Sequence, residues 1–259
     1  MTETRLGDQM GNVAVTATLR RDAWWVEPLL VVLVLGGFVV YSTWAALQNA
    51  HYYAAPYLSP FYSPCIAANC DHVSFQLIGR WWNWSPAFLI LWAPGLFRLT
   101  CYYYRKAYYR AFWWTPPACA VSDARARYGG ETRFPLIFQN VHRYAFYLAV
   151  LFIVILMWDA ILALRFPDGF GVGVGTLVLW ANVGLLGLYT FSCHSCRHLC
   201  GGHVDVFSNA PARYRIWRGL SRLNERHAVF AWLSLFGVAL ADLYVRLVSM
   251  GIIRDIRVL

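Results

Sequence analysis

Five long apolar stretches, separated by polar or aromatic segments, constrain what this chain can fold into. They cover residues 29–47, 86–103, 144–166, 172–193 and 228–250. A helix that crosses the hydrocarbon core of a bilayer needs about 20 mostly apolar residues. Charged residues make up only 14% of the chain, too little to cover a soluble globule of 259 residues. The sequence therefore predicts an all-α integral membrane protein, a bundle of five transmembrane helices.

The second of these stretches is the weakest, because Pro94 and Gly95 interrupt it and Arg98 lies near its end. Proline is tolerated in membrane helices when neighbouring groups satisfy the freed backbone. Without this span the basic loops would fall on opposite sides of the membrane, so we retain it.

Arginine and lysine are distributed unequally between the two sides of this arrangement. Of the 22 basic residues, 17 lie in the N-terminal segment, in 98–143 or in 197–226. Cytoplasmic loops carry an excess of basic residues, so the N-terminus is expected in the cytoplasm and the C-terminus outside. The chain then divides into a cytoplasmic segment, 1–28, and a transmembrane domain, 29–259, with an outer loop 48–85 and inner loops 104–143 and 194–227. This distribution explains the net charge of +9 without a nucleic-acid partner.

The outer loop is aromatic, with Trp81, Trp82 and Trp84 just before the second span, as is typical of a membrane interface. Cys65 and Cys70 lie in this loop, on the oxidising side of the membrane. We expect a disulfide between them.

The densest group of chemically active residues lies at the inner end of the fourth span. Three cysteines and three histidines fall within eleven residues: Cys193, His194, Cys196, His198, Cys200 and His203. Cys193 and Cys196 are three residues apart and would share one face of a helix. Thiolates with imidazoles suit a tetrahedral zinc site or a Rieske-type [2Fe–2S] cluster, in which two cysteines hold one iron and two histidines the other. Metal-free packing is the alternative.

Further candidate ligands lie at the inner ends of other spans: Cys101, His142 and His227. Antiparallel helices would place all of these at one depth in the membrane. The sequence does not show that they meet.

Ionisable residues inside the outer halves of the spans form a second group. Asp159 lies in the third span, and Asp242 and Arg246 lie four residues apart in the fifth. Charge inside a membrane is costly and usually faces the bundle interior or a water path. A proton route or a polar head-group site is one reading, and a structural ion pair is the other.

The stretch 101–110 (CYYYRKAYYR) is both aromatic and basic. It suits anchoring to anionic lipid, or docking of a soluble partner, because tyrosine and arginine dominate interface hot spots. The sequence contains no phosphate-binding loop, dinucleotide fingerprint or nucleophile elbow.

Several long motifs resemble the single-chain membrane anchor of actinobacterial-type succinate dehydrogenases, respiratory complex II. They are 100–110 (TCYYYRKAYYR), 116–121 (PPACAV), 139–144 (QNVHRY), 193–198 (CHSCRH) and 223–227 (LNERH), and the resemblance extends from about Tyr53 onward. It implies a multi-pass protein of a bacterial cytoplasmic membrane. Flavoprotein and iron–sulfur subunits would dock on the cytoplasmic side, and this chain would pass their electrons to a membrane quinone, with menaquinone expected. A higher oligomer of the complex is compatible with the sequence.

The resemblance has one departure that concerns the cofactor. Better-known anchors of this kind bind haem b through a histidine upstream of an Arg-His-Leu run, and Phe191 takes that place here. Haem b remains an alternative through His142, His194 or His227. Loss of the haem ligand beside the gain of Cys193 and Cys196 favours a Rieske-type [2Fe–2S] cluster.

The expected cluster ligands are Cys193, Cys196, His198 and His142, with His194 and Cys101 in reserve. For quinone, we expect Tyr104 and Arg197 near the inner face, and Asp159, Asp242 and Arg246 at a distal site or proton path. Two rival functions are a stand-alone membrane oxidoreductase, for which the soluble segments are short, and a zinc-stabilised transporter, which would usually show paired broken helices.

Overall fold

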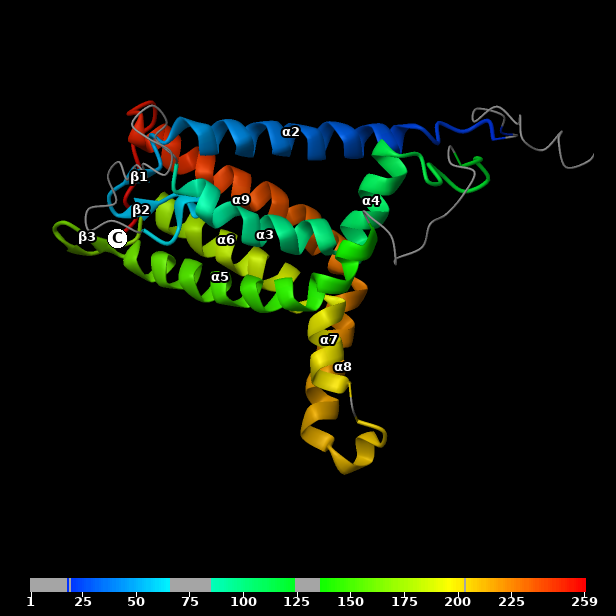
Figure 1. Cartoon of the computed structure of the whole chain (residues 1–259). Coiled ribbons are helices and arrows are strands. Elements are labelled where there is room, and N and C mark those ends of the chain that lie inside the picture. The colour runs from blue at the N-terminus through cyan, green and yellow to red at the C-terminus, as the bar shows by residue number, and fades with distance from the viewer. Residues whose placement is uncertain (1–17, 19, 66–84, 124–135, 203) are drawn as a thin grey trace, which may run out of the picture.

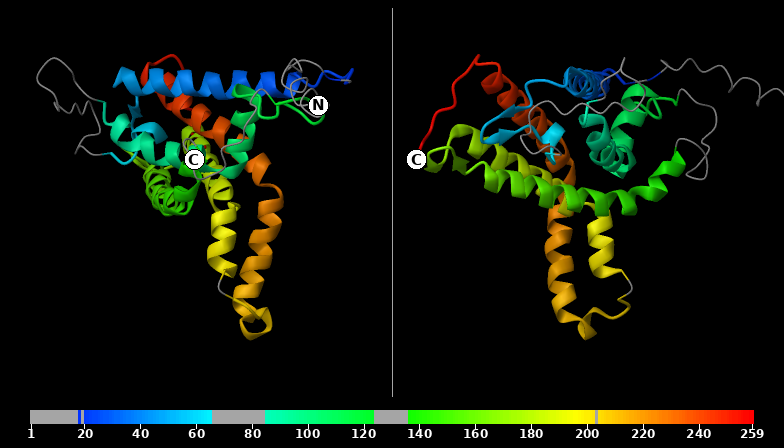
Figure 2. Two further views of the ribbon diagram at one scale, coloured as in Figure 1. Left: turned by 45° about the vertical axis from the view of Figure 1, so that its right-hand side comes forward. Right: turned by 60° about the vertical axis from the view of Figure 1, so that its left-hand side comes forward.

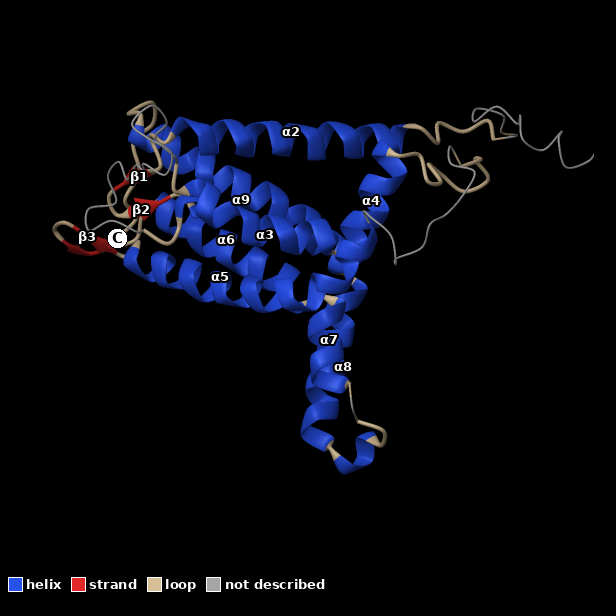
Figure 3. Ribbon diagram, viewed as in Figure 1, coloured by secondary structure: helices blue, strands red, loops and turns tan. Residues whose placement is uncertain are grey.

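The computed structural model describes residues 18, 20–65, 85–123, 136–202 and 204–259. Within them the chain forms eight α-helices and two short antiparallel hairpins (Figures 1 and 3). The helices are α2 (Val26–Gln48), α3 (Ala87–Thr100), α4 (Tyr102–Phe112), α5 (His142–Leu162), α6 (Val174–Phe191), α7 (His194–Gly201), α8 (Pro211–Glu225) and α9 (His227–Ser249). The hairpins pair β1 (Tyr53–Ala54) with β2 (Tyr57–Leu58), and β3 (Arg165–Phe166) with β4 (Gly169–Phe170). Three short 3-10 helices are η2 (Pro60–Tyr62), η3 (Leu136–Val141) and η4 (Phe207–Asn209).

Four helical segments of the described chain are long and apolar enough to cross a membrane. They are Val26–Gln48, Ile137–Leu162, Val174–Phe191 and His227–Ser249. These confirm the first, third, fourth and fifth predicted spans, with the first beginning three residues earlier than expected.

Helix α3 is the remaining predicted span, and its 14 residues extend only about 21 Å at 1.5 Å per residue. Its buried residues recur every three or four positions and face the bundle: Ala87, Ile90, Ala93, Phe97 and Thr100. The opposite face exposes Leu89, Trp92 and Leu99, each more than half accessible. The helix therefore has one face against the bundle and one exposed apolar face, and a fifth span at α3 stays a prediction.

Small residues allow the helices to approach closely. Ala145, Ala160, Ala231 and Ala241 are completely buried on α5 and α9. Large apolar side chains point outward, as at Val154 of α5, which is 62% exposed. In a membrane, helix association depends on close packing rather than on exclusion of water, and small interface residues favour it.

The two ends of the bundle differ in architecture. At one end, which we call the basic end, α4 and the hairpin of α7 and α8 run crosswise to the long helices, and the α7–α8 hairpin projects beyond the bundle (Figures 1 and 2). The segments predicted as inner loops thus contain three helices. At the opposite end lie both β-hairpins and the C-terminus (Figure 1). The basic end is the one that the charge distribution assigns to the cytoplasm.

A carboxylate fixes the C-terminal tail at the opposite end. Asp255 accepts hydrogen bonds from the hydroxyls of Tyr57 and Tyr244, each at 2.6 Å, and from the backbone N–H of Gly175 at 2.9 Å. These contacts tie the tail to the start of α6 and to β2. Cys65 forms a disulfide in this region. Its expected partner, Cys70, and the predicted interfacial tryptophans Trp81, Trp82 and Trp84 lie outside the described residues.

Candidate functional site

Two cysteines occupy equivalent bends at the basic end. Cys101 is the single extended residue between α3 and α4, with φ −64° and ψ 127°. Cys193 is the single extended residue between α6 and α7, with φ −64° and ψ 146°. Each bend turns the chain from a long helix into a crosswise one. Each cysteine is thereby held inside the bundle, with a relative exposure of 2% and 1%.

Two histidines begin the helices that return into the bundle. His142 is the first residue of α5 and His227 the first of α9. Both side chains are buried. The return helices therefore bring two imidazoles to the level at which the two thiols lie.

Each imidazole bridges both bends. His142 Nδ1 lies 2.8 Å from the Thr100 hydroxyl, and its Nε2 lies 3.0 Å from Cys193 Sγ. His227 repeats this arrangement from the other side. Its Nδ1 lies 2.7 Å from the Ser192 hydroxyl and its Nε2 3.3 Å from Cys101 Sγ. Because each histidine contacts one bend through a hydroxyl and the other through sulfur, the four residues form one site, which we call the Cys–His centre (Cys101, His142, Cys193 and His227).

Stacked rings enclose the Cys–His centre. Phe97 stacks on His142 with ring centroids 4.9 Å apart, and Tyr189 stacks on His227 at 5.1 Å. Phe97 and Tyr189 contact each other at 5.3 Å, so the four rings form a continuous series. The centre is consequently closed to solvent by aromatic side chains from α3 and α6.

The structure places the other predicted ligands on α7, outward from this centre. Cys196 borders the same core. Burial, with Cys200 one turn further on, raises the pKa of Cys196 to about 11. His198 contacts Arg143, and His194 is exposed. Burial of part of its ring, with Arg197 and His198 nearby, lowers the pKa of His194. In the described part of the chain, no group of three or more potential ligands converges as a single metal ion would require.

Arg98 and Tyr104 form a polar link beside the Cys–His centre. The Arg98 guanidinium donates to the Tyr104 hydroxyl at 2.6 Å and to Ser234 Oγ at 3.0 Å, and lies 4.7 Å from the Tyr189 ring centroid. The Tyr104 hydroxyl donates to the Ala231 carbonyl at 2.6 Å. Tyr104, predicted to bind quinone, therefore has its hydroxyl engaged inside the bundle.

Arg197, the second residue predicted for quinone near this end, joins the two helices of the α7–α8 hairpin. It donates from Nε to the Ser221 hydroxyl at 2.9 Å and lies 4.8 Å from the Trp217 ring centroid. Both partners are on α8. The contacts give Arg197 a role in holding the hairpin together.

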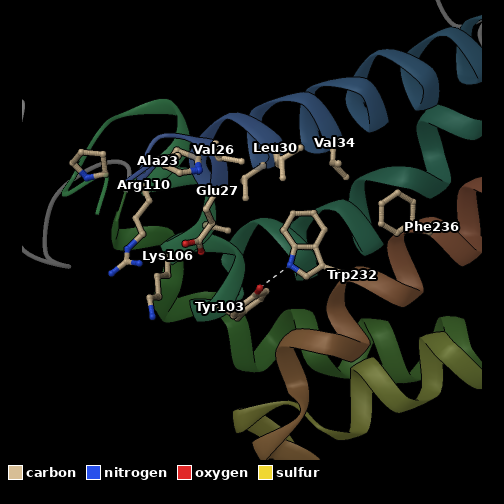
Figure 4. A pocket seen from close by; sticks show the side chains of 14 residues that line it. Ala23, Val26, Glu27, Leu30, Val34, Tyr103, Lys106, Arg110, Trp232 and Phe236 are labelled. Atoms are coloured by element: carbon tan, nitrogen blue, oxygen red, sulfur yellow. Dashed lines mark hydrogen bonds between the residues drawn. The ribbon is translucent and has the colours of Figure 1, made fainter. Parts of the chain in front are cut away.

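A pocket of about 600 Å³ lies at the basic end between α2, α4 and α9 (Figure 4). Its walls include Trp232 and Phe236 of α9, and Tyr103 and Lys106 of α4. The Trp232 Nε1–H donates to the Tyr103 hydroxyl at 2.6 Å. Neither Trp232 nor the pocket was predicted, because its walls come from three helices far apart in the sequence.

Asp242 and Arg246, the predicted ionisable residues of the fifth span, lie at the opposite end in a closed network. Asp242 accepts from Arg246 Nε at 2.7 Å, from the Tyr41 hydroxyl at 2.6 Å and from the Ser59 hydroxyl. Arg246 also donates to the backbone carbonyls of Ala45 and Ala50. Both charged side chains are at most 1% exposed. These contacts favour the alternative in which Asp242 and Arg246 form a structural ion pair.

Asp159 lies apart from this network. It accepts a hydrogen bond from the Ser63 hydroxyl. Among the described residues, no contact joins it to Asp242, and the two carboxylates accept from different serines of the segment after α2.

Fold and site together define a multi-pass helical membrane protein with a buried cysteine–histidine centre at the basic end of its bundle. A family model described as actinobacterial succinate dehydrogenase subunit SdhC matches residues 26–251. The chain therefore belongs to this family and is a membrane subunit of an oxidoreductase complex, which confirms the resemblance seen in the sequence.

A solved structure supports the same assignment. A chain of the Mycobacterium smegmatis Sdh1 complex in the apo form is 48% identical and superposes with a TM-score of 0.84, over 93% of this chain and 94% of that chain. None of the curated proteins matches the chain.

Proposed function

We propose that this chain anchors succinate dehydrogenase in the bacterial membrane and passes electrons from a docked iron–sulfur subunit to a membrane quinone, menaquinone. We further propose that a Rieske-type [2Fe–2S] cluster mediates this transfer, held by the Cys–His centre. The observation that supports the cluster is the crossed arrangement in which His142 and His227 each bridge both cysteine bends. In this proposal Cys101 and His227 replace Cys196 and His198 of the ligand set that the sequence predicted.

The donor set fits such a cluster in number and in chemistry. Two thiols and two imidazoles are the ligands that Rieske centres use. Thr100 and Ser192 hold the Nδ1 atoms of the two histidines, which orients each ring as outer-shell hydrogen bonds do at metal sites. When bound, the cluster supplies one-electron transfer.

The packing around the histidines disfavours haem b, the alternative cofactor. Each imidazole Nε2 already lies within 3.0–3.3 Å of a cysteine sulfur. Phe97 and Tyr189 cover the ring faces. A haem macrocycle would have to displace Phe97 and Tyr189 from these ring faces, whereas a smaller [2Fe–2S] cluster would require only that the imidazoles and thiols separate.

The residues of this chain have distinct tasks in the proposed transfer. The two bends hold the thiols at a common depth, and the stacked rings exclude water from them. Arg98 places a positive charge against Tyr189, beside the Cys–His centre. A nearby cation stabilises added negative charge in a medium of low dielectric, so Arg98 favours the arrival of an electron.

The partners of the complex, the flavoprotein and iron–sulfur subunits, would dock at the basic end. Helix α8 and the residue that ends it present four exposed arginines spaced three or four residues apart: Arg215, Arg218, Arg222 and Arg226. Leu220 points the other way and packs against the core that contains Cys101 and Cys193. The arginine face is therefore turned away from the bundle and suits an acidic protein surface.

Electron paramagnetic resonance of the reduced complex, with iron and sulfide analysis, tests the proposed function. A Rieske-type signal is expected beyond those of the soluble subunits, and Cys193→Ser should abolish it. Cys200→Ser is the matched control, because Cys200 lies at the end of α7 that is far from the bend. This variant should keep the signal. A haem spectrum, or a membrane subunit without iron in a complex that still reduces quinone, would overturn the cluster.

A further inference from the structure

Tyr189 differs from Phe97, the other ring that encloses the Cys–His centre, because it carries a hydroxyl into the closed interior. Its side chain lies near the end of α6 and is only 1% exposed. Its ring is nearly parallel to that of His227, with the two planes tilted by 17°. Among the described residues, no nitrogen or oxygen atom forms a hydrogen bond with the Tyr189 hydroxyl. Tyr189 therefore holds a buried hydrogen-bond donor beside the centre.

The partner that the surroundings offer to this hydroxyl is a sulfur atom. The Tyr189 hydroxyl interacts with the thiol of Cys101, and both side chains belong to one core cluster. The neighbouring polar groups are engaged elsewhere. Arg98 donates to Tyr104 and Ser234, and the Tyr104 hydroxyl donates to a backbone carbonyl. The hydroxyl of Tyr189 is thus left to the sulfur of Cys101.

Packing alone does not account for this hydroxyl. Phe97 takes the corresponding place on the other histidine, stacked on His142, and has no hydroxyl. A phenylalanine in α6 could stack on His227 in the same way without burying a polar group, which is costly when its hydrogen bond is unmade. A thiol sulfur is a weak acceptor, whereas a thiolate that binds iron carries negative charge and accepts more strongly. The hydroxyl therefore suits the ligated form of Cys101.

We propose that Tyr189 donates a hydrogen bond to the Cys101 thiolate in the cluster-bound centre and thereby raises the reduction potential, an inference that rests on the proposed function. Hydrogen bonds to the sulfur atoms are among the factors that set the potential of an iron–sulfur cluster. Reduction adds one negative charge, so a donor to sulfur stabilises the reduced state more than the oxidised state. The electron comes from the docked iron–sulfur subunit and leaves to the quinone, and Tyr189 keeps its proton throughout. Tyr189 is therefore a positioning residue that acts through Cys101.

The second thiol has a donor of a different kind. Cys193 directly precedes α7, and its sulfur lies 3.4 Å from the backbone N–H of Ser195. A side-chain substitution leaves that N–H in place. The Tyr189 hydroxyl, in contrast, is removed by a single substitution that keeps the ring, so its effect on the potential can be measured by itself.

A redox titration of the intact complex, followed by electron paramagnetic resonance, tests the inference. Tyr189→Phe should keep the Rieske-type signal and lower its midpoint potential. A tenfold fall in the equilibrium constant for reduction is expected, which corresponds to about 59 mV for one electron. Tyr108→Phe is the matched control at the same end, because the Tyr108 hydroxyl donates to the Leu99 carbonyl at 3.0 Å, away from both thiols. Its potential should equal that of the wild type.

A fluorotyrosine in place of Tyr189 gives a second variant that retains the ring and the hydroxyl. Fluorine makes the phenol a stronger donor, so the midpoint potential should rise above that of the wild type. This variant decides the question if Tyr189→Phe does not retain iron. Pulsed electron paramagnetic resonance in deuterated buffer adds a spectroscopic readout, because Tyr189→Phe should lose one exchangeable deuteron coupled to the centre while Tyr108→Phe keeps it.

The outcomes separate this inference from the proposed function. A Rieske-type signal whose potential is the same in the wild type and in the fluorotyrosine complex overturns the role of Tyr189 and leaves the proposed function intact. An equal fall of the potential in Tyr189→Phe and Tyr108→Phe also overturns it, because the effect would then not depend on the contact with Cys101. A wild-type complex without the signal rejects the proposed cluster, and this inference with it.

Discussion

His142 Nε2 lies 3.0 Å from Cys193 Sγ, which joins the first residue of α5 to the bend that ends α6. The contact connects residues 51 positions apart in the chain. His198, in contrast, lies on the crosswise helix α7 and contacts Arg143. Two histidines close to the same cysteine motif thus have different surroundings, and only His142 is enclosed with the thiols.

Substitution of these two histidines distinguishes the predicted ligand set from the observed Cys–His centre. We expect His142→Gln to abolish the Rieske-type signal and to lower succinate–quinone activity at least tenfold, because outer-shell changes alone typically cost 10–100-fold in metal affinity or activity. His198→Gln should keep the signal. Low-temperature electron paramagnetic resonance of both complexes checks this. Loss of the signal in His198→Gln as well as in His142→Gln would instead favour the ligand set predicted from the sequence.

The buried ion pair of α9 should stabilise the fold strongly. Asp242→Ala leaves Arg246 buried and without its carboxylate, a change that costs about 3–5 kcal/mol. The exposed pair of Asp168 and Arg257 provides the control, because loss of an exposed ion pair costs about 0–1 kcal/mol. Thermal unfolding of Asp242→Ala and Asp168→Ala in mild detergent compares them. If Asp242→Ala instead slowed quinone reduction without lowering the melting temperature, the result would favour a proton path at this end over a structural ion pair.

Two glycines of α6 should respond oppositely to alanine. At Gly175 a Cβ would lie 2.5 Å from Cε2 of the Tyr57 ring, and that ring is held by its hydrogen bond to Asp255. Overpacking of this kind costs about 1–3 kcal/mol. At Gly184 a Cβ meets nothing within 4 Å, so alanine should stabilise the helix by about 0.5–1 kcal/mol. Melting temperatures of the two variants should therefore move in opposite directions, and a stabilising Gly175→Ala would contradict the close approach of Tyr57.

The arginine face of α8 should govern assembly of the complex. Arg215→Glu with Arg222→Glu places like charge against an acidic partner surface, so the soluble subunits should dissociate more readily, with the largest effect at low ionic strength. Arg254→Glu, exposed at the opposite end, is the control. The fraction of soluble subunits retained on purified membranes, measured over a salt series, checks the prediction. Equal retention in both variants would place the docking surface elsewhere.

Hydropathy and charge were enough to predict four of the long helices and the grouping of basic segments at one end. Hydropathy and charge could not predict the bends at Cys101 and Cys193. Each bend consists of a single extended residue without glycine or proline, so no turn-forming residue marks it in the sequence. The predicted ligand set favoured Cys196 because its spacing from Cys193 suits one helix face. In the structure Cys193 is the extended residue directly before α7, so it is not itself part of that helix. A hydroxyl residue directly precedes each bend cysteine, Thr100 and Ser192, and this repeated pair was the available clue.

The transmembrane role of α3 can be decided by the sidedness of two exposed positions. Cys119 lies in the segment after α4, and His51 lies between α2 and α3; both are exposed. If α3 crosses the membrane, these positions lie on opposite sides, with Cys119 in the cytoplasm. In spheroplasts, a membrane-impermeant maleimide should then label His51→Cys from outside, whereas native Cys119 should react only in inverted vesicles. Labelling of both positions from the same side would mean that α3 does not cross. The 14 residues of α3 are few for a span, but no described residue covers its face of Leu89, Trp92 and Leu99, and lipid is the environment that suits this face.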